Sequence, residues 1–278
     1  MSRFAKIFLV IISSITLLDI AYLASIWPAW EDLAQGPIPE STFIKQYRDH
    51  RRENPDLPPL RWTPSQESLS KELTMPFIIA EDSRFYNHLG VDIEALADAV
   101  EYNLKRKKLA LGASTISQQT VKNLFLSSSR SLLRKWHELI LTAAMETHLS
   151  KKRILQIYLN IAEFGHGIFG IHAASLYYFY KSPSALTTEE LVSLAASLPS
   201  PKKHNPQTQT EAFEKRKTRI LSVIKKYHQN LLSPPAIEDG FDLELMDPIE
   251  ADLDEPESEA TDHETDLSNE NVAKDLPN

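Results

Sequence analysis

The chain has 278 residues, of which 42% are hydrophobic, which is enough for one sizeable domain with appendages but too little for two large catalytic domains. The absence of cysteine excludes a disulfide framework, a cysteine-ligated zinc site and a thiol nucleophile. The net charge of −8 is uneven, because residues 238–278 hold 16 acids and one base, which leaves 22 acids, 29 bases and a net charge of +7 in residues 1–237. Such a mildly basic body suits an anionic lipid or a pyrophosphate as partner, and we expect no nucleic acid.

An apolar run at residues 7–27 is long enough to cross a bilayer as a helix. Basic residues precede the run and aromatic residues follow it, which predicts a cytoplasmic N-terminus: Arg3, Lys6, Trp27 and Trp30. A cleaved signal peptide is the alternative, but the run is long for one and no clear cleavage site follows. Asp19 lies inside the run, where a carboxylate is costly, and protonation, reach toward the headgroups or pairing with a partner helix stay open as explanations.

The sequence after the anchor predicts a mostly α fold without internal repeats. Apolar residues recur at helical spacing in three stretches: Ile93, Leu96, Ala97, Val100 and Leu104; Leu132, Leu133, Trp136, Leu139, Ile140 and Ala143; Ile154, Ile157, Tyr158 and Ile161. The Pro-rich stretch 55–64 favours a linker, and the acidic C-terminal residues favour a disordered, solubilising tail. The predicted divisions are a cytoplasmic N-terminus at 1–6, a transmembrane helix at 7–27, a linker at 28–70, a helical domain at 71–232 and an acidic tail at 233–278.

The first motif with chemical potential is E-D-S-R-F-Y-N-H-L-G at residues 81–90. Glu81 follows an apolar segment, and partial desolvation can prepare a carboxylate to act as a general base or acid. A solvated acidic loop after a helix is the commoner alternative for such a composition. A lone histidine such as His88 is also more often structural than catalytic.

The second motif is G-A-S-T-I-S-Q-Q-T-V-K-N at residues 112–123. Ser114 is suited to cap the N-terminus of a helix that begins here. On that helix one face would carry a hydroxyl, two amides and an ammonium: Thr115, Gln119, Lys122 and Asn123. Such a face fits sugar hydroxyls and phosphate oxygens, and an ordinary exposed amphipathic helix is the alternative.

The third motif is R-K-W-H-E at residues 134–138, in which Arg134 and Glu138 are one helical turn apart. A surface salt bridge is the commoner interpretation of this spacing. The functional interpretation is a cationic clamp for a leaving pyrophosphate, held in place by the carboxylate.

In order and spacing, these motifs resemble those of glycosyltransferase family 51, the peptidoglycan polymerase module of class A penicillin-binding proteins. Within that family the sequence is most similar to the monofunctional biosynthetic peptidoglycan transglycosylases. The resemblance rests on the three motifs, on Y-L-N at 158–160 and on Leu198-Pro199 with Pro201, and it covers residues 75–206, about half the chain. Gln156 departs from the pattern, since many relatives carry glutamate there.

The resemblance implies a lysozyme-like, mostly helical domain with a membrane-facing lobe. It implies inverting polymerisation of lipid II into β-1,4-linked glycan, with undecaprenyl diphosphate as the leaving group. Glu81 corresponds to the general base, and Glu138 to a second glutamate that organises the pyrophosphate site, sometimes with Mg²⁺ or Mn²⁺. The corresponding substrate-binding positions are His88, Ser114, Thr115, Gln118, Gln119, Lys122, Asn123, Arg134 and Lys135.

The expected location is the bacterial inner membrane, with one span and a periplasmic catalytic domain. The expected partners are lipid II, the growing lipid-linked glycan strand, the membrane and other cell-wall synthesis proteins. The stretch after residue 206 lacks the length of a transpeptidase domain, so we expect no peptide cross-linking. Two alternatives stay open: a lytic transglycosylase or lysozyme-like hydrolase of glycan, and a non-catalytic membrane scaffold for cell-wall enzymes.

Overall fold

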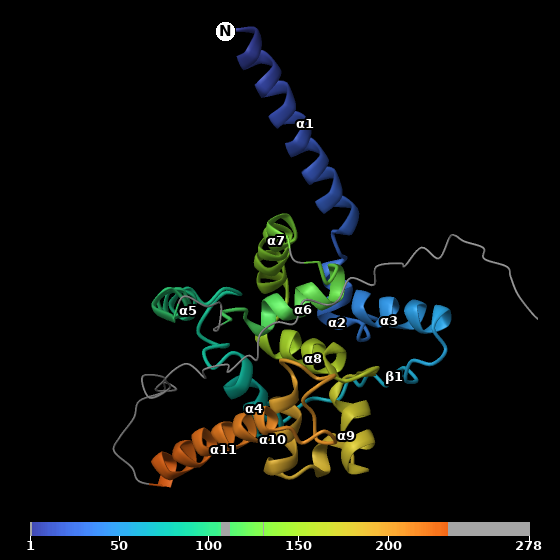
Figure 1. Ribbon diagram of the computed structural model, residues 1–278, viewed down its shortest axis with the longest axis vertical. Coiled ribbons are helices and arrows are strands. Elements are labelled where there is room, and N and C mark those ends of the chain that lie inside the picture. Colours follow the sequence, from blue (N-terminus) through green and yellow to red (C-terminus); the bar gives the residue numbers. More distant parts are fainter. Residues whose placement is uncertain (1, 107–111, 130, 233–278) are drawn as a thin grey trace, which may run out of the picture.

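The computed structural model describes residues 2–106, 112–129 and 131–232, and the predicted acidic tail at 233–278 lies outside them. The described chain is mostly helical, as predicted (Figure 1). The helices are α1 (Arg3–Ile26), α2 (Trp30–Gln35), α3 (Thr42–Glu53), α4 (Lys71–Glu81), α5 (Ile93–Arg106), α6 (Ile116–Phe125), α7 (Leu132–His148), α8 (Lys151–Ile161), α9 (Ile171–Phe179), the 3-10 helix η1 (Pro183–Ala185), α10 (Thr188–Ser197) and α11 (Glu211–Leu232). The strands are β1 (Arg61–Trp62), β2 (Glu163–Gly165) and β3 (Ile168–Phe169).

Helix α1 projects away from the rest of the chain (Figure 1). It has 24 residues, none of them buried, so it measures about 36 Å at 1.5 Å per residue. The mean hydropathy of its most apolar window is 2.3, and by length and composition it is able to cross a bilayer. The apolar run predicted from the sequence therefore forms one continuous helix, and no residue of its most apolar window is buried.

The core of the domain lies among the central and C-terminal helices. Helix α8 buries its predicted apolar stripe completely, including Ile154, Ile157 and Tyr158. Helix α6 packs against α7 and α8, and α10 packs against α4 and α11. This arrangement brings the C-terminal end of α4, the cation-bearing helix α6 and the first turns of α7 into one neighbourhood.

Residues 30–62, which the sequence predicts to lie in a linker, contribute to the same core. Trp30 of α2 and Ile44 and Tyr47 of α3 are buried and belong to the central hydrophobic cluster. Strand β1 pairs in parallel with β3, and β3 pairs antiparallel with β2. These strands have two or three residues each, too few for a period-two pattern, so the sequence did not reveal the sheet.

Helices α5 and α7 confirm two of the helices predicted from apolar spacing, but their apolar stripes face outward. Leu132 is 91% exposed, and Leu133, Trp136, Ile93 and Leu104 are all more than half exposed. In α7 the buried face instead carries His137 and Glu138 together with apolar residues further along the helix. An apolar stripe thus marks one face of these helices without being the face that enters the protein core.

Candidate active site

Glu81 lies at the C-terminal end of α4 with its side chain only 9% exposed. Its Oε2 accepts a hydrogen bond from Nε2 of Gln119 on α6 at 2.8 Å. Its Oε1 accepts a hydrogen bond from Nη2 of Arg216 on α11 at 2.7 Å, and the same nitrogen donates to the carbonyl oxygen of Ala80 at 3.0 Å. Three helices that are distant in sequence therefore hold this carboxylate in one orientation.

Glu138 lies on the buried face of α7, and its side chain is 3% exposed. Arg134 Nη1 donates to its Oε2 at 2.5 Å, and Lys135 donates to its Oε1. Arg134 is also held by the carbonyl oxygen of Ser129, to which its Nε donates at 2.6 Å. The salt bridge predicted at this spacing is therefore partly buried rather than a solvated surface pair, and it fixes two cations side by side.

Lys122 on α6 connects the two glutamates electrostatically. Its pKa is lowered from the usual lysine value mainly by burial, and Arg134 and Lys135 lower it further. The charges of Glu138 and Glu81 act in the opposite direction, which places the ammonium within the field of both carboxylates. We call Glu81, Gln119, Lys122, Arg134, Lys135, Glu138 and Arg216 the carboxylate–cation cluster.

His88 and Asp82 hold the first motif against the start of α6. Asp82 Oδ1 lies 2.9 Å from His88 Nε2, and Asp82 Oδ2 accepts from the backbone N–H of Ile116 at 2.9 Å. His88 Nδ1 accepts from the N–H of Gly90, which assigns the proton of the neutral ring to Nε2. His88 was predicted to bind substrate, but its side chain is 8% exposed and both ring nitrogens are engaged within the protein.

The N-cap of α6 is Thr115 and not Ser114 as predicted. Thr115 Oγ1 accepts from the N–H of Gln118, and the Gln118 side chain accepts from the N–H of Thr115, forming a capping box. Thr115 also donates to the carbonyl oxygen of Gly90 at 2.6 Å, so both side chains are buried in backbone contacts. Ser114 instead accepts from Lys135 at 3.3 Å, while Asn123 is half-buried near the end of α6.

Two functional partners were missed in the sequence. Arg216 lies beyond the stretch of recognised motifs, and nothing in its local sequence indicates a contact with Glu81. Tyr158, which the sequence placed in the apolar stripe of α8 and in the Y-L-N motif without assigning it a role, donates through its hydroxyl to Gln119 Oε1 at 3.1 Å. Burial raises the pKa of Tyr158 well above its usual value, so the hydroxyl stays a donor and orients the Gln119 amide toward Glu81.

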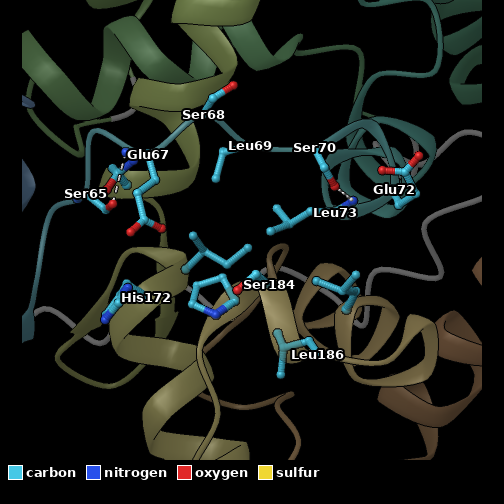
Figure 2. Close-up of a pocket in the computed structure, with 14 residues that line it drawn as sticks. Ser65, Glu67, Ser68, Leu69, Ser70, Glu72, Leu73, His172, Ser184 and Leu186 are labelled. Atoms are coloured by element: carbon cyan, nitrogen blue, oxygen red, sulfur yellow. Dashed lines mark hydrogen bonds between the residues drawn. The ribbon is translucent and has the colours of Figure 1, made fainter.

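A separate cavity of about 350 Å³ opens between residues 65–73 and the segment from α9 to α10 (Figure 2). Its lining includes several serines, Glu67, Glu72 and His172. None of the residues predicted to bind substrate or act in catalysis lines it. The chemistry predicted from the motifs therefore belongs to the carboxylate–cation cluster and not to this cavity.

Comparison with known proteins agrees with the motifs. The sequence model of the transglycosylase family matches residues 56–225, more than half of the chain. The chain belongs to the transglycosylase family. The match includes every residue of the carboxylate–cation cluster, including Arg216 of α11.

This transglycosylase is similar to proteins named biosynthetic peptidoglycan transglycosylase. The Haemophilus influenzae protein of strain KW20 is 44% identical over 188 residues, which cover 66% of this chain and 76% of the relative. The Shewanella oneidensis protein is 48% identical over 162 residues, covering 58% and 69% of the two chains. The Chromobacterium violaceum protein is 43% identical over 161 residues, covering 58% and 70%.

Proposed function

We propose that this transglycosylase polymerises lipid II into β-1,4-linked glycan strands and releases undecaprenyl diphosphate. The observation that carries the proposal is that Glu81 and Glu138 meet at α6. Gln119 of that helix donates to Glu81 at 2.8 Å, and Lys135, which is bonded to Glu138, donates to Ser114 directly before the helix. One carboxylate able to accept a proton thereby lies close to a group of cations able to neutralise a diphosphate. This pair of functions is what transfer of a sugar from a lipid diphosphate to an alcohol requires.

Glu81 is the residue that we assign as general base. In the proposed step it takes the proton from the 4-hydroxyl of the incoming lipid II disaccharide, and that oxygen attacks the anomeric carbon of the growing chain. The bond from this carbon to the diphosphate oxygen breaks as the new glycosidic bond forms, so the configuration inverts. Gln119 and Arg216 both donate to Glu81 as an ionised carboxylate, which is the form that a base needs.

Lys122, Arg134 and Lys135 are the residues that we assign to the departing diphosphate. Negative charge grows on the leaving oxygen in the transition state, and fixed cations in a partly desolvated site stabilise it without reorganisation. Glu138 accepts from Arg134 and Lys135, so its role in this proposal is to hold both cations in place.

A divalent ion at Glu138 is less well supported by the geometry. Both oxygens of Glu138 already accept from cationic side chains, so the site offers no free carboxylate oxygen to Mg²⁺ or Mn²⁺. Within the described residues, Asp82, His88 and Asp92 do have ligand atoms within 4.8 Å of one another. Those atoms, however, are bound to Arg84 and to backbone N–H groups, so we assign no step to a metal.

The hydrolase alternative calls for a different state of the site. A lytic enzyme needs a protonated carboxylic acid beside the glycosidic oxygen, whereas the two donors on Glu81 suit a carboxylate. The neighbouring cations can neutralise the charge of a diphosphate, whereas a neutral glycan carries no charge for them to neutralise. Both features favour polymerisation of lipid II over cleavage of finished strands.

The membrane arrangement that we propose has α1 crossing the inner membrane with its N-terminus in the cytoplasm. The basic residues at the start of α1 support this orientation, and the outward apolar side chains of α5 and α7 support contact with the outer leaflet. In this arrangement the domain lies in the periplasm, beside the headgroups that carry the substrate. Other cell-wall synthesis proteins are proposed as partners on the basis of the family alone.

Polymerisation of labelled lipid II by the full chain tests the proposed reaction. We expect glycan polymer from the parent protein and a 10²- to 10⁴-fold lower rate from Glu81→Gln, because the base is lost with little change in shape. Glu72→Gln is the matched control, since it changes an exposed carboxylate on the same helix. A Glu81→Gln variant with the parental rate contradicts the assignment, and soluble fragments released from finished strands would favour the hydrolase.

The proposed topology has an independent test, because the chain has no cysteine of its own. A single cysteine replacing Asp49, whose side chain is 65% exposed, should react with a membrane-impermeant maleimide added to the outer face of the inner membrane. A cysteine replacing Ser2 should react only after the membrane is broken. The reverse pattern of labelling contradicts the orientation.

A further inference from the structure

The C-terminal end of helix α1 meets the folded domain near helix α7 (Figure 1). Asp19 of α1 contacts His137 of α7, and Trp30 just beyond α1 stacks on His148 at the end of α7 with ring centroids 5.4 Å apart. Because the earlier residues pair together and the later residues pair together, the two segments run in the same direction. Helix α7 therefore extends from the folded domain along the last part of the membrane anchor.

The contact at Asp19 is polar and specific. Its Oδ1 lies 2.6 Å from His137 Nε2, and its Oδ2 accepts from Trp136 Nε1 at 3.3 Å. The His137 ring also packs against Tyr22 of α1, with centroids 4.7 Å apart. The His137 side chain is 5% exposed and that of Asp19 22%, so both ends of the pair are largely shielded.

The depth of Asp19 makes this contact important. It lies seven residues before Ile26, at which α1 ends, which is about 10 Å along the helix axis. A carboxylate at that depth of an apolar span is unfavourable unless a partner satisfies it. Of the three explanations that the sequence left open, pairing with a helix is the one that the structure supplies, and the helix belongs to the same chain.

His137 is also the immediate neighbour of Glu138. The same turn of α7 also holds Arg134 and Lys135, and both of these cations donate to Glu138. A rigid helix transmits a fixed position over so short a distance, so the height of α1 in the membrane sets the height of these cations. The diphosphate of a membrane-bound lipid is itself confined to the headgroup level.

We propose that Asp19 is a positioning residue for the polymerisation reaction, acting through His137 to hold the cations of α7 at the level of the lipid diphosphate. This inference rests on the proposed function and adds a role for the anchor within it. The anchor then does more than tether the enzyme, because its one acidic residue aligns the binding site with the substrate. Loss of the contact should weaken capture of the lipid more than it slows the chemical step.

The test uses the full chain in lipid nanodiscs, with lipid II as substrate. We expect Asp19→Leu and His137→Leu each to raise KM about tenfold while kcat changes less than threefold, since a charge-assisted hydrogen bond is lost from a shielded site. The double variant should be no worse than either single variant, because both changes remove the same contact. Leu18→Ala is the matched control, since Leu18 is 71% exposed on the same helix, and it should keep the parental KM.

A second measurement does not depend on activity. Spin labels on cysteines replacing Ile15 of α1 and Leu132 of α7, both exposed, report the distance between the helices in a chain that has no other cysteine. We expect one narrow distance distribution in the parent and a broad one after Asp19→Leu. If the parent fails to polymerise lipid II but shows this change, the proposed function fails and the helix contact stands.

Four results would overturn the inference. The first is a KM for Asp19→Leu within twofold of the parental value. The second is a fall in kcat alone, which indicates loss of active enzyme rather than misplacement of the site. The third is a distance distribution unchanged by Asp19→Leu, and the fourth is a double variant whose effect equals the sum of the two single effects.

Discussion

Helices α7 and α8 are neighbours in the chain and both are amphipathic, yet their apolar stripes meet different surroundings. Helix α8 places its apolar stripe in the core, where Ile154, Ile157 and Ile161 are fully shielded. Helix α7 turns its apolar first turns outward and buries Glu138, to which the partly exposed Arg134 and Lys135 donate. The difference teaches that an apolar stripe identifies a face of a helix but not the medium that the face meets.

The medium that each face meets follows from the position of the helix, and five expected results test the contrast. Helix α8 is surrounded by protein, so its apolar face gains from exclusion of water inside the fold. Helix α7 runs beside the end of the anchor, so its apolar face is available to hydrocarbon while its polar face serves the site.

The largest expected effect is on α8. Ile157→Ala should lower the free energy of unfolding by about 2–5 kcal/mol, because it removes a fully buried side chain and leaves a cavity. Urea unfolding of the detergent-solubilised chain, followed by circular dichroism, measures the change. A loss below about 1 kcal/mol would mean that α8 is not part of the central core.

Glu138→Gln should reduce kcat/KM about 100-fold, or about 2.7 kcal/mol in transition-state free energy, because Arg134 and Lys135 lose their shared charged acceptor. The measurement is steady-state polymerisation of lipid II. Glu146→Gln is the matched control on the same helix, because Glu146 is bonded to Lys151 and Ser117, neither of which belongs to the cluster. It should cost stability while the rate per folded molecule stays within threefold of the parent, and equal losses in both variants would contradict a special role for Glu138.

Arg216→Met should lower kcat about tenfold, or about 1.4 kcal/mol, because Glu81 loses one of the two donors that orient it. Arg216→Lys keeps the charge and a donor and should recover most of that loss. Methionine preserves the packing of α11 but removes the donor to Glu81, whereas lysine restores a donor. Recovery by lysine would therefore show that Arg216 acts by orienting Glu81. A lysine variant as slow as the methionine variant would argue for a packing role.

The pH dependence of kcat/KM should have an alkaline limb set by Lys122. Burial lowers the pKa of this ammonium, so its charge is present below the lowered pKa and is lost as pH rises through it, earlier than for an ordinary lysine. Replacement by arginine, which stays charged throughout, should remove the limb. A limb that persists unchanged in Lys122→Arg would assign it to another group.

The smallest expected effect is on the outer face of α7. Leu132→Ala should change the free energy of unfolding by less than about 0.5 kcal/mol, because the side chain is 91% exposed and leaves no cavity. In a chain without α1, the same substitution should instead lower the affinity for lipid vesicles. A large loss of folding stability would show that protein, and not lipid, covers this face.

Much of the fold and of the site was predictable, because local signals were strong there. Helical spacing predicted α5, α7 and α8, and the length and apolarity of residues 7–27 predicted the continuous helix α1. Glu81, Gln119, Lys122, Arg134, Lys135 and Glu138 were selected by their motifs, and the structure brings them together. The family match supports the same motifs over residues 56–225.

Other features depended on contacts between distant parts of the chain. Arg216 meets Glu81 only because α11 packs against α4. In the first and second motifs, some polar residues join the carboxylate–cation cluster, whereas others form hydrogen bonds with the backbone. The roles of His88, Thr115 and Gln118 in fixing local structure could not be separated in advance from substrate contact, since both uses call for the same polar groups.

The sequence by itself determined that α1, α5, α7 and α8 are helices and that α1 is apolar enough for a membrane. It also selected most of the polar residues of the carboxylate–cation cluster. Those properties depend on neighbours within a few positions along the chain, where spacing and capping act. Only the tertiary structure decided that the apolar face of α7 points outward, that Arg216 reaches Glu81 and that Asp19 finds His137. Each of these depends on how helices pack across more than a hundred residues of chain, and no local pattern records that geometry.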